Sequence, residues 1–371
     1  MNFEFSEDQQ FVQHTAREFL AEHAGLEVCR AVLESKRPYD AELWKGVAEM
    51  GWLGAAVPES FGGAGLGHLE LVLLAEEMGR SLAPIPFSSS VYLATEALLL
   101  AGSDDQKKRY LPRLASGELI GTFALAEGLA GSDATRVETR FSEGQLSGEK
   151  LPVPDGEVAG LAVVAARSGQ GAPSLVLVEL DGDGVERIPV ESIDPSRGLV
   201  RLRFDRAPGE FLGEAGRGAE LAEHLLDRAA VLFAFEQLGG ASRALDLTRG
   251  QALERYAFGR PVASFQAIKH RLADLYCAIE LARSNDYYGA WALSHGNDEL
   301  ALAACNARVA STEAFELAAK EMIQIYGGVG FTWEYDCHLF YRRARWLDAL
   351  LGGAGAWREK LIQRLEARDA A

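Results

Sequence analysis

The sequence predicts an α+β protein in which two helical regions flank a central antiparallel β-domain. The first region, 6–117, carries apolar residues at helical spacing, and one long helix in it is expected over 69–80. Between 120 and 212 the pattern changes to short apolar runs, separated by clusters of glycine, proline, aspartate and serine. Helical spacing returns after 213–218 and continues to the C-terminus. We therefore expect three domains, which span 1–118, 119–212 and 213–371.

The N-terminal region opens with a helix-start signal. Ser6 precedes two acidic residues and Gln9, a spacing at which the serine and glutamine side chains cap the first turn reciprocally. Side chains that follow at intervals of four residues predict one packed stripe along this helix. The expected stripe consists of Phe11, Thr15, Phe19 and His23.

The other two regions differ in residue composition and in the spacing of their apolar residues. The central region is expected to form seven or eight strands, and its clearest apolar runs are 122–126, 161–166, 174–179 and 199–204. The C-terminal region is rich in alanine, leucine and glutamate, as a four-helix bundle requires. Its longest stretches of this kind are 220–255 and 300–326.

The charge of the chain limits its partners. It carries 54 acidic and 37 basic residues, which gives a net charge of −17. Such a charge argues against nucleic acid and anionic membrane surfaces, because both would repel it. It does not exclude a phosphate-bearing ligand, since a few local arginines can hold a diphosphate. No run of about 18 apolar residues occurs, so we expect no membrane insertion.

The cysteines and the N-terminal residues indicate in which cellular compartment the protein is expected. The first residues are acidic and lack a basic stretch followed by an apolar run, which argues against a secretory signal. The four cysteines are scattered, without a CxxC pair or a histidine at metal-ligand spacing. Free thiols of this kind are typical of a reducing compartment. We therefore expect a cytoplasmic protein without a metal site.

Two C-terminal segments carry the strongest functional signal. The first, RYAFGRPVASFQAIKHRLAD, spans 255–274, and the second, QIYGGVGFTWE, spans 324–334. Together they closely resemble the FAD-binding signatures of the acyl-CoA dehydrogenase family. The order of helical, β and helical regions is also that of the family, so the resemblance covers essentially the whole chain. It implies FAD as cofactor, a tetramer built as a dimer of dimers, and flavin sites formed between subunits.

The resemblance assigns FAD contacts to six residues of these segments. The Arg255 guanidinium would fork onto the flavin diphosphate, and Phe258 would pack at the adenine–ribose end. Two glutamines would offer amide hydrogen bonds there, and a pair of glycines would let the backbone approach a phosphate closely. The six residues are Arg255, Phe258, Gln266, Gln324, Gly327 and Gly328.

Four more positions match functional positions of the family. Leu125 and Ala126 correspond to residues whose backbone amides face the flavin ring. Ser132 and Asp227 correspond to residues that contact the pantetheine arm of coenzyme A. For Ser132 the simpler interpretation, a serine that caps a turn, stays open.

One segment departs from the family pattern. Where relatives carry a Trp-x-Thr that covers the flavin and hydrogen-bonds its N5 atom, this chain has Pro152 and Pro154. Proline has no amide hydrogen, so Pro154 cannot donate that bond from its side chain or its backbone. Binding through the diphosphate end does not depend on this segment.

The catalytic base is the second departure. Removing the α-proton beside a thioester needs a carboxylate, because this C–H group is only weakly acidic. Relatives place a glutamate at one of two positions, which correspond here to Leu351 and Ala229. Glu236 is the substitute that we predict. It follows Ala229 by about 1.94 helical turns and therefore projects from nearly the same face.

The role of Glu236 has an open alternative. It ends an otherwise apolar run, 229–235, so burial is expected to raise its pKa toward that of a general base. The same carboxylate could instead cap a polar network or line an enlarged acyl pocket. Asp348 is a weaker candidate for the base, since a helix-end salt bridge explains it more simply.

The resemblance implies an enzyme that performs FAD-dependent α,β-dehydrogenation of an acyl-CoA to the trans-2-enoyl-CoA, in fatty acid or sterol side-chain β-oxidation. Its electrons would pass to an electron-transfer flavoprotein. The alternatives are a non-catalytic or half-site partner subunit of a heteromeric acyl-CoA dehydrogenase, and an oxidase or monooxygenase of the same fold. The residues leave open the class of acyl chain, the electron acceptor, and whether the tetramer has one or two kinds of chain.

Overall fold

The computed structural model describes residues 5–35, 37–128, 133–169, 171–296 and 298–370. The chain forms two compact units, each assembled from segments that are distant in the sequence. Unit 1 comprises Met1–Ala31, Val72–Ala83 and Ala230–Ala371, and unit 2 comprises Val32–Leu71 and Pro84–Ala229. The three-domain division stays a prediction, because these units combine parts of the predicted domains.

The N-terminal region is helical, as predicted. The predicted helix over 69–80 is present and begins one residue earlier. Its helices are α1 (Glu7–His23), α2 (Leu26–Ser35), α3 (Ala41–Glu49), α4 (His68–Arg80), the π-helical segment η3 (Ser88–Thr95), α5 (Glu96–Ala101) and α6 (Asp104–Ala115).

The start of α1 confirms the predicted capping box. The backbone amide of Gln9 donates to Ser6 Oγ at 3.2 Å, and the amide of Ser6 donates to Gln9 Oε1 at 2.9 Å. The predicted packed stripe is wrong, since Phe11 is 70% exposed. The buried residues of α1 are instead Ala16 and Leu20, because the face that packs is rotated by about one residue from the aromatic one.

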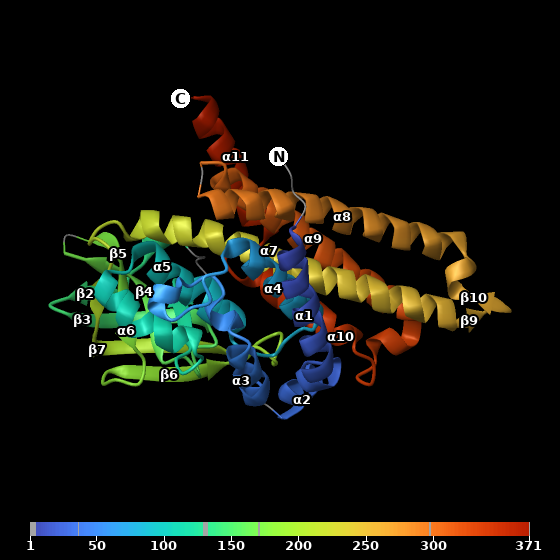
Figure 1. Ribbon diagram of the computed structural model, residues 1–371, viewed down its shortest axis with the longest axis horizontal. Coiled ribbons are helices and arrows are strands. Elements are labelled where there is room, and N and C mark those ends of the chain that lie inside the picture. Colours follow the sequence, from blue (N-terminus) through green and yellow to red (C-terminus); the bar gives the residue numbers. More distant parts are fainter. Residues whose placement is uncertain (1–4, 36, 129–132, 170, 297, 371) are drawn as a thin grey trace. The chain divides into compact units, whose positions relative to one another are not determined.

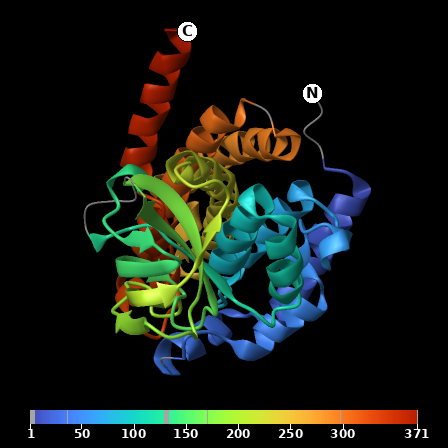
Figure 2. The same ribbon diagram turned by 90° about the vertical axis from the view of Figure 1, so that its left-hand side faces the viewer.

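The described residues of unit 2 form an eight-stranded sheet in the order β6-β7-β3-β2-β4-β5-β8, with β1 beside β4. Figure 2 shows its strands lying together in green and yellow-green. Most pairs are antiparallel, as predicted, but β1 and β2 both run parallel to β4. The strands are β1 (Gly121–Ala124), β2 (Arg140–Ser142), β3 (Gln145–Pro154), β4 (Leu161–Ser168), β5 (Ala172–Glu179), β6 (Val185–Val190), β7 (Leu199–Pro208) and β8 (Glu210–Leu212).

The C-terminal region returns to helices. A short hairpin of two strands joins α7 to α8 at the end of both helices (Figure 1). Helices α8 and α9 lie side by side in unit 1 (Figure 1). The elements are α7 (Gly218–Glu254), β9 (Tyr256–Ala257), β10 (Arg260–Pro261), α8 (Gln266–His295), α9 (Leu300–Tyr326), the 3-10 segment η7 (Gly327–Phe331), α10 (Cys337–Ala349) and α11 (Ala354–Asp369).

Glycines allow α7 to pack closely within unit 1. A Cβ on Gly239 would lie 1.8 Å from the backbone oxygen of Glu76 in α4. A Cβ on Gly240 would lie 2.5 Å from the ring of Phe315 in α9. Side chains at these two positions would push the helices apart, so the Gly-Gly pair sets the distance of α7 from both neighbours.

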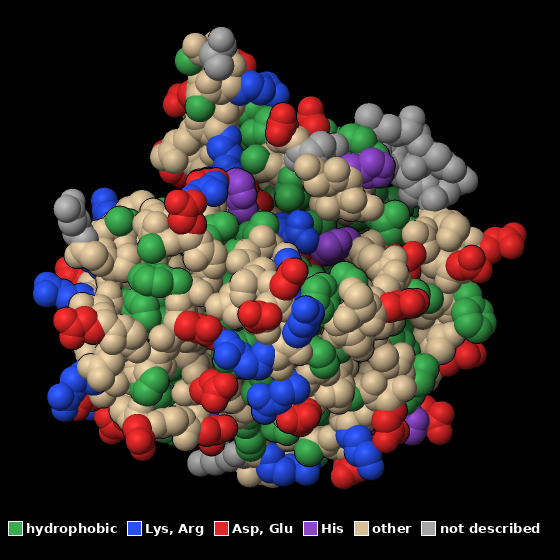
Figure 3. Space-filling model, turned by 60° about the vertical axis from the view of Figure 1, so that its left-hand side comes forward, with side chains coloured by type: hydrophobic (Ala, Val, Ile, Leu, Met, Phe, Trp, Pro, Cys, Tyr) green, Lys and Arg blue, Asp and Glu red, His purple; other side chains and the backbone are tan. Residues whose placement is uncertain are grey.

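The surface carries charges of both signs. On the face shown in Figure 3, acidic and basic side chains are interspersed rather than separated into broad fields. Over the part of the chain that the structure describes, no helix combines the length and the apolar character needed to cross a membrane.

Candidate functional site

The two segments that carry the flavin signature meet in unit 1. Arg255 directly follows α7, and its Nη1 atom donates a hydrogen bond to the backbone oxygen of Tyr326, although 71 residues separate them. A Cβ on the adjacent Gly327 would lie only 2.8 Å from the same Nη1 atom, and Gly327 has a φ of +67°. Glycine is therefore the residue that this turn accepts, and its backbone shares a surface with the arginine.

The Arg255 guanidinium keeps donors for a ligand. Its side chain is exposed, and the bond to Tyr326 is the one hydrogen bond or ion pair that it makes with the described residues. A guanidinium carries five N–H donors in a planar fork, which matches phosphate oxygens. Its remaining donors fit the diphosphate that the resemblance assigns to Arg255.

Large aromatic side chains stand unusually exposed around this turn. Phe258 at the tip of the hairpin is 96% exposed, Phe331 in η7 is 82% exposed, and Tyr256 is 68% exposed. Phe265 supports the hairpin, with its ring 6.3 Å from that of Phe258 and the Arg260 guanidinium 4.0 Å above it. Exposed aromatic groups of this size mark a surface that a ligand or partner covers.

The other residues of the two segments lie on the same elements. Gln266 is the first residue of α8, and Gln324 lies in the last turn of α9. Both are exposed, and a Cβ on Gly328 would meet no atom within 4 Å. The cation, the aromatic groups, the amides and the open glycine backbone together fit the adenine–diphosphate end of FAD.

The positions predicted to face the flavin ring lie at the end of β1 in unit 2. Lys150 Nζ donates to the backbone oxygen of Leu125 at 3.1 Å, and the amide of Leu151 donates to that of Ala126 at 2.8 Å. Lys150 is fully buried, and burial lowers its pKa to about 8 although its partner Glu127 lies 2.7 Å away. The segment is thus held to β3 by its carbonyl groups.

The structure shows what Pro152 and Pro154 do at the positions where the family carries Trp-x-Thr. Pro154 is buried, and its carbonyl accepts a 2.6 Å hydrogen bond from Thr122 Oγ1. Pro152 is exposed and follows a cis peptide bond. Pro154 thus serves the interior of the sheet and offers no N–H group to a ligand.

Of the two predicted contacts to coenzyme A, Ser132 lies outside the described residues. Asp227 is in α7, in the part that belongs to unit 2, and is 4% exposed.

A cluster of three polar side chains includes Arg228, the residue that follows Asp227 in sequence. Arg228 Nε donates to Glu96 Oε2 at 2.7 Å, and His68 Nε2 lies 2.9 Å from Glu96 Oε1. Burial alone would raise the pKa of Glu96, but its contacts with His68 and Arg228 outweigh burial, and the pKa is lowered. No local sequence pattern indicates this cluster, because its three members come from separate elements.

The proposed base, Glu236, lies in the unit 1 part of α7. It is 3% exposed, and its Oε1 atom is 4.0 Å from Nη1 of the equally buried Arg343. Arg343 also donates to the backbone oxygen of Leu82 at 3.2 Å. A Cβ on Gly79 would lie 1.8 Å from the backbone oxygen of Glu236, so α4 packs tightly here. Glu236 lines neither of the two cavities described below.

The two positions at which the resemblance would place the base hold apolar residues with structural contacts of their own. Ala229 is fully buried. Leu351 follows α10, and its carbonyl accepts a 3.1 Å hydrogen bond from Trp357 Nε1. Asp348 has the helix-end role that was predicted as its simpler interpretation, since it pairs with Arg345 at 3.3 Å and accepts from the amide of Ala354.

Comparisons with known proteins cover nearly the whole chain. The family model described as acyl-CoA dehydrogenase, N-terminal domain, matches residues 6–118, and the model of the C-terminal domain matches residues 216–365. The chain is 34% identical over 361 residues to the acyl-CoA dehydrogenase IpdE2 of Mycobacterium tuberculosis, which covers 97% of this chain and 96% of that protein.

Solved structures agree with the sequence comparison. A chain of the Tcur3481–Tcur3483 steroid ACAD variant has a TM-score of 0.90 and 31% identity, covering 98% of this chain and 99% of that one. A chain of the ChsE4–ChsE5 complex from Mycobacterium tuberculosis has a TM-score of 0.90 and 27% identity, covering 99% of both chains. The similarity therefore extends through all of the helical and β regions.

Proposed function

This chain belongs to the acyl-CoA dehydrogenase family, and we propose that it takes part in FAD-dependent α,β-dehydrogenation of an acyl-CoA to the trans-2-enoyl-CoA. The observation that carries the proposal is the contact of Arg255 with the Tyr326–Gly327 turn beside exposed aromatic groups. We propose further that the electrons pass to an electron-transfer flavoprotein, and that the enzyme is a tetramer.

Arg255 and the glycine turn would hold the diphosphate of FAD, and Phe258, Gln266 and Gln324 its adenine–ribose end. FAD, when bound, supplies a two-electron acceptor for the β-hydrogen of the substrate. The gathering of several exposed aromatic side chains beside Arg255 supports a site that is completed by a neighbouring subunit, since clustered apolar surface is typical of an interaction site.

The protein itself must remove the α-proton. In a self-sufficient enzyme Glu236 would take it on a carboxylate oxygen, in surroundings from which its burial excludes water. Donors to the thioester oxygen would stabilise the negative charge that develops there. Asp227, and Ser132, would contact the pantetheine arm.

A second candidate is a half-site partner subunit, in which another kind of chain supplies the base. Three observations favour it. Ala229 and Leu351 carry no acid, and Glu236 is enclosed by α4 and paired with Arg343. The similar ChsE4–ChsE5 structure is a complex of two differently named chains. Similarity to a steroid ACAD makes steroid acyl-CoA esters the first substrates to test for either candidate.

Anaerobic mixing with an acyl-CoA tests the proposal. A dehydrogenase loses its visible flavin absorbance and forms enoyl-CoA, and the electron-transfer flavoprotein then restores the absorbance. Glu236→Gln separates the two candidates. If Glu236 is the base, the variant keeps flavin and loses turnover by about 100-fold or more. If turnover of the complete assembly is unchanged, the base belongs to another chain.

A further inference from the structure

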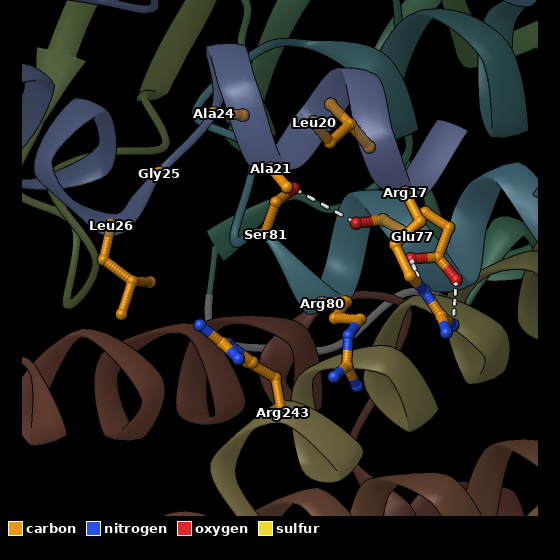
Figure 4. A pocket seen from close by; sticks show the side chains of 10 residues that line it. All are labelled: Arg17, Leu20, Ala21, Ala24, Gly25, Leu26, Glu77, Arg80, Ser81 and Arg243. Atoms are coloured by element: carbon orange, nitrogen blue, oxygen red, sulfur yellow. Dashed lines mark hydrogen bonds and ion pairs between the residues drawn. The ribbon is translucent and has the colours of Figure 1, made fainter. Parts of the chain in front are cut away.

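A cavity of about 290 Å³ lies within unit 1, and none of its lining residues belongs to the flavin signature segments. Residues of α1, α4 and α7 line it, together with Ala24 and Gly25 after α1, Leu26 at the start of α2 and Ser81 after α4 (Figure 4). Its volume is at the lower end of the range of ligand pockets, so it would hold a small molecule. Three arginines and one glutamate give it its charge: Arg17, Arg80, Arg243 and Glu77.

Two of the three arginines already have carboxylate partners. Arg17 binds the buried Glu77 through two hydrogen bonds, of 3.1 Å from Nε and 2.7 Å from Nη2. Arg80 Nη2 lies 2.5 Å from Asp246 Oδ2, on α7. Each carboxylate therefore makes its direct contact with one guanidinium, and neither makes one with the third.

Arg243 is the third arginine, and Asp246 acts on its charge only from a distance, without an ion pair. Arg243 is half-buried in α7, and among the residues that the structure describes none makes a hydrogen bond or an ion pair with its side chain. Figure 4 shows its guanidinium reaching from α7 to the cavity, with Arg80 nearby. Burial, and the charge of Arg80 after it, lower the pKa of Arg243. Asp246 partly offsets this effect, and an anion bound directly to the guanidinium would stabilise the partly desolvated cation further.

Most of the rest of the lining is apolar: Leu20 and Ala21 of α1, Ala24 directly after it, and Leu26 at the start of α2. The exception is Ser81, whose hydroxyl already donates to backbone oxygens of α4. Arg17 and Arg80 are each paired with a carboxylate. The positive charge that is left to attract a ligand is that of Arg243. A singly charged anion with a hydrocarbon body satisfies both sides, whereas a doubly charged inorganic ion would leave the apolar wall uncovered.

We infer that this cavity binds a small organic carboxylate, which Arg243 holds through the fork of its guanidinium. The planar fork matches the two oxygens of a carboxylate, and the short hydrocarbon part lies on the wall formed by α1. The inference is independent of the proposed flavin site, because no residue is shared between them.

A larger neighbouring cavity supplies a matched control. Its volume is about 630 Å³, and it shares Arg17 and Arg80 with the first. Arg249 lines this second cavity, lies on α7 like Arg243, and is exposed, so water can solvate its charge. Arg249→Gln removes one arginine from the same helix without touching the lining of the first cavity.

Isothermal titration of the purified full-length protein with butyrate tests the inference. Butyrate is expected to bind the wild type and Arg249→Gln alike, and Arg243→Gln at least about tenfold more weakly, a difference of about 1.4 kcal/mol. Butyramide has nearly the shape of butyrate without its charge and is expected to bind the wild type at least about tenfold more weakly as well. This second comparison needs no variant, so it stands even if Arg243→Gln does not fold.

Three results would overturn the inference. One is no heat of binding for butyrate with the wild type. Another is equal affinity of butyrate for the wild type and Arg243→Gln, which would place the bound carboxylate elsewhere. The third is inorganic phosphate binding as tightly as butyrate, which would show a site for counter-ions without use for the apolar wall.

Discussion

The Nη1 atom of Arg255 lies so close to Gly327 that a Cβ on the glycine would come within 2.8 Å of it. This contact joins the end of α7 to the turn after α9, and it is the structural centre of the proposed cofactor site. The positive φ of +67° at Gly327 makes the turn itself dependent on glycine.

Gly327→Ala is expected to weaken FAD binding as well as stability. The methyl group would push the guanidinium from its place, and the combination of φ +67° with ψ −141°, which residues other than glycine rarely adopt, adds a strain of about 1 to 3 kcal/mol. Gly296→Ala is the control for a positive φ alone, because Gly296 has a left-handed helical φ of +58° and ψ of 36°, and a Cβ there meets no atom within 4 Å. Thermal unfolding of both variants measures the cost to the fold, and FAD titration measures the cost to the cofactor site. Equal FAD affinity in the two variants would contradict the prediction.

Glu236 and Arg343 are expected to stabilise the fold as a coupled pair. Both are buried and 4.0 Å apart, so removing one charge takes away part of the compensation of the other. In a double-mutant cycle with Glu236→Gln and Arg343→Met, the coupling free energy from urea unfolding should exceed about 1 kcal/mol.

The pair Arg271–Glu321 is a control for that cycle. It also joins two helices, but the arginine side chain is 48% exposed, and its coupling should stay below about 1 kcal/mol. The same small value in both cycles would contradict the prediction that Glu236 and Arg343 stabilise the fold as a pair.

Asp286 is expected to make stability depend on pH. Burial raises its pKa well above the ordinary value, although the Ser311 hydroxyl, which donates to Oδ2 at 2.6 Å, opposes the shift. Below the pKa of the unfolded chain, near 3.8, both states hold the proton and the residue has no effect. As the pH rises above this value, the unfolded state releases its proton first, so the folded state loses relative stability.

Asp286→Asn removes this dependence and can keep the bond to Ser311. The variant should therefore match the wild type near pH 4 and exceed it increasingly toward pH 7, by up to about 1.4 kcal/mol per pH unit. Urea unfolding of both proteins across this range measures the difference. A difference that does not change with pH would show that Asp286 is ionised in the folded protein.

Local patterns of the sequence predicted much of the fold. The capping box at Ser6, the helix over 69–80 and the change to strands after 120 all depend on neighbouring residues. The packed face of α1 was predicted wrongly, because the four-residue spacing of Phe11 and its successors is also compatible with an exposed stripe. Two parallel pairings in the sheet were missed as well, since pairing partners are set by connections that no local pattern encodes.

In the candidate site, too, local motifs could be predicted from the sequence, but contacts between distant residues could not. The two signature segments can be found in the sequence, but not the contact of Arg255 with Tyr326 across 71 residues. The cluster of His68, Glu96 and Arg228 and the missing partner of Arg243 were equally invisible. Each depends on which side chains face one another across separate helices.

The central claim is that Arg255 and the glycine turn contribute to an FAD site. Its most direct test is the flavin content of the purified protein after incubation with FAD, compared between the wild type and Arg255→Gln. We predict near-stoichiometric FAD in the wild type and a loss of affinity of about tenfold or more in the variant, since charge-assisted bonds to a phosphate are removed. Equal flavin content and affinity in the two proteins would contradict the claim.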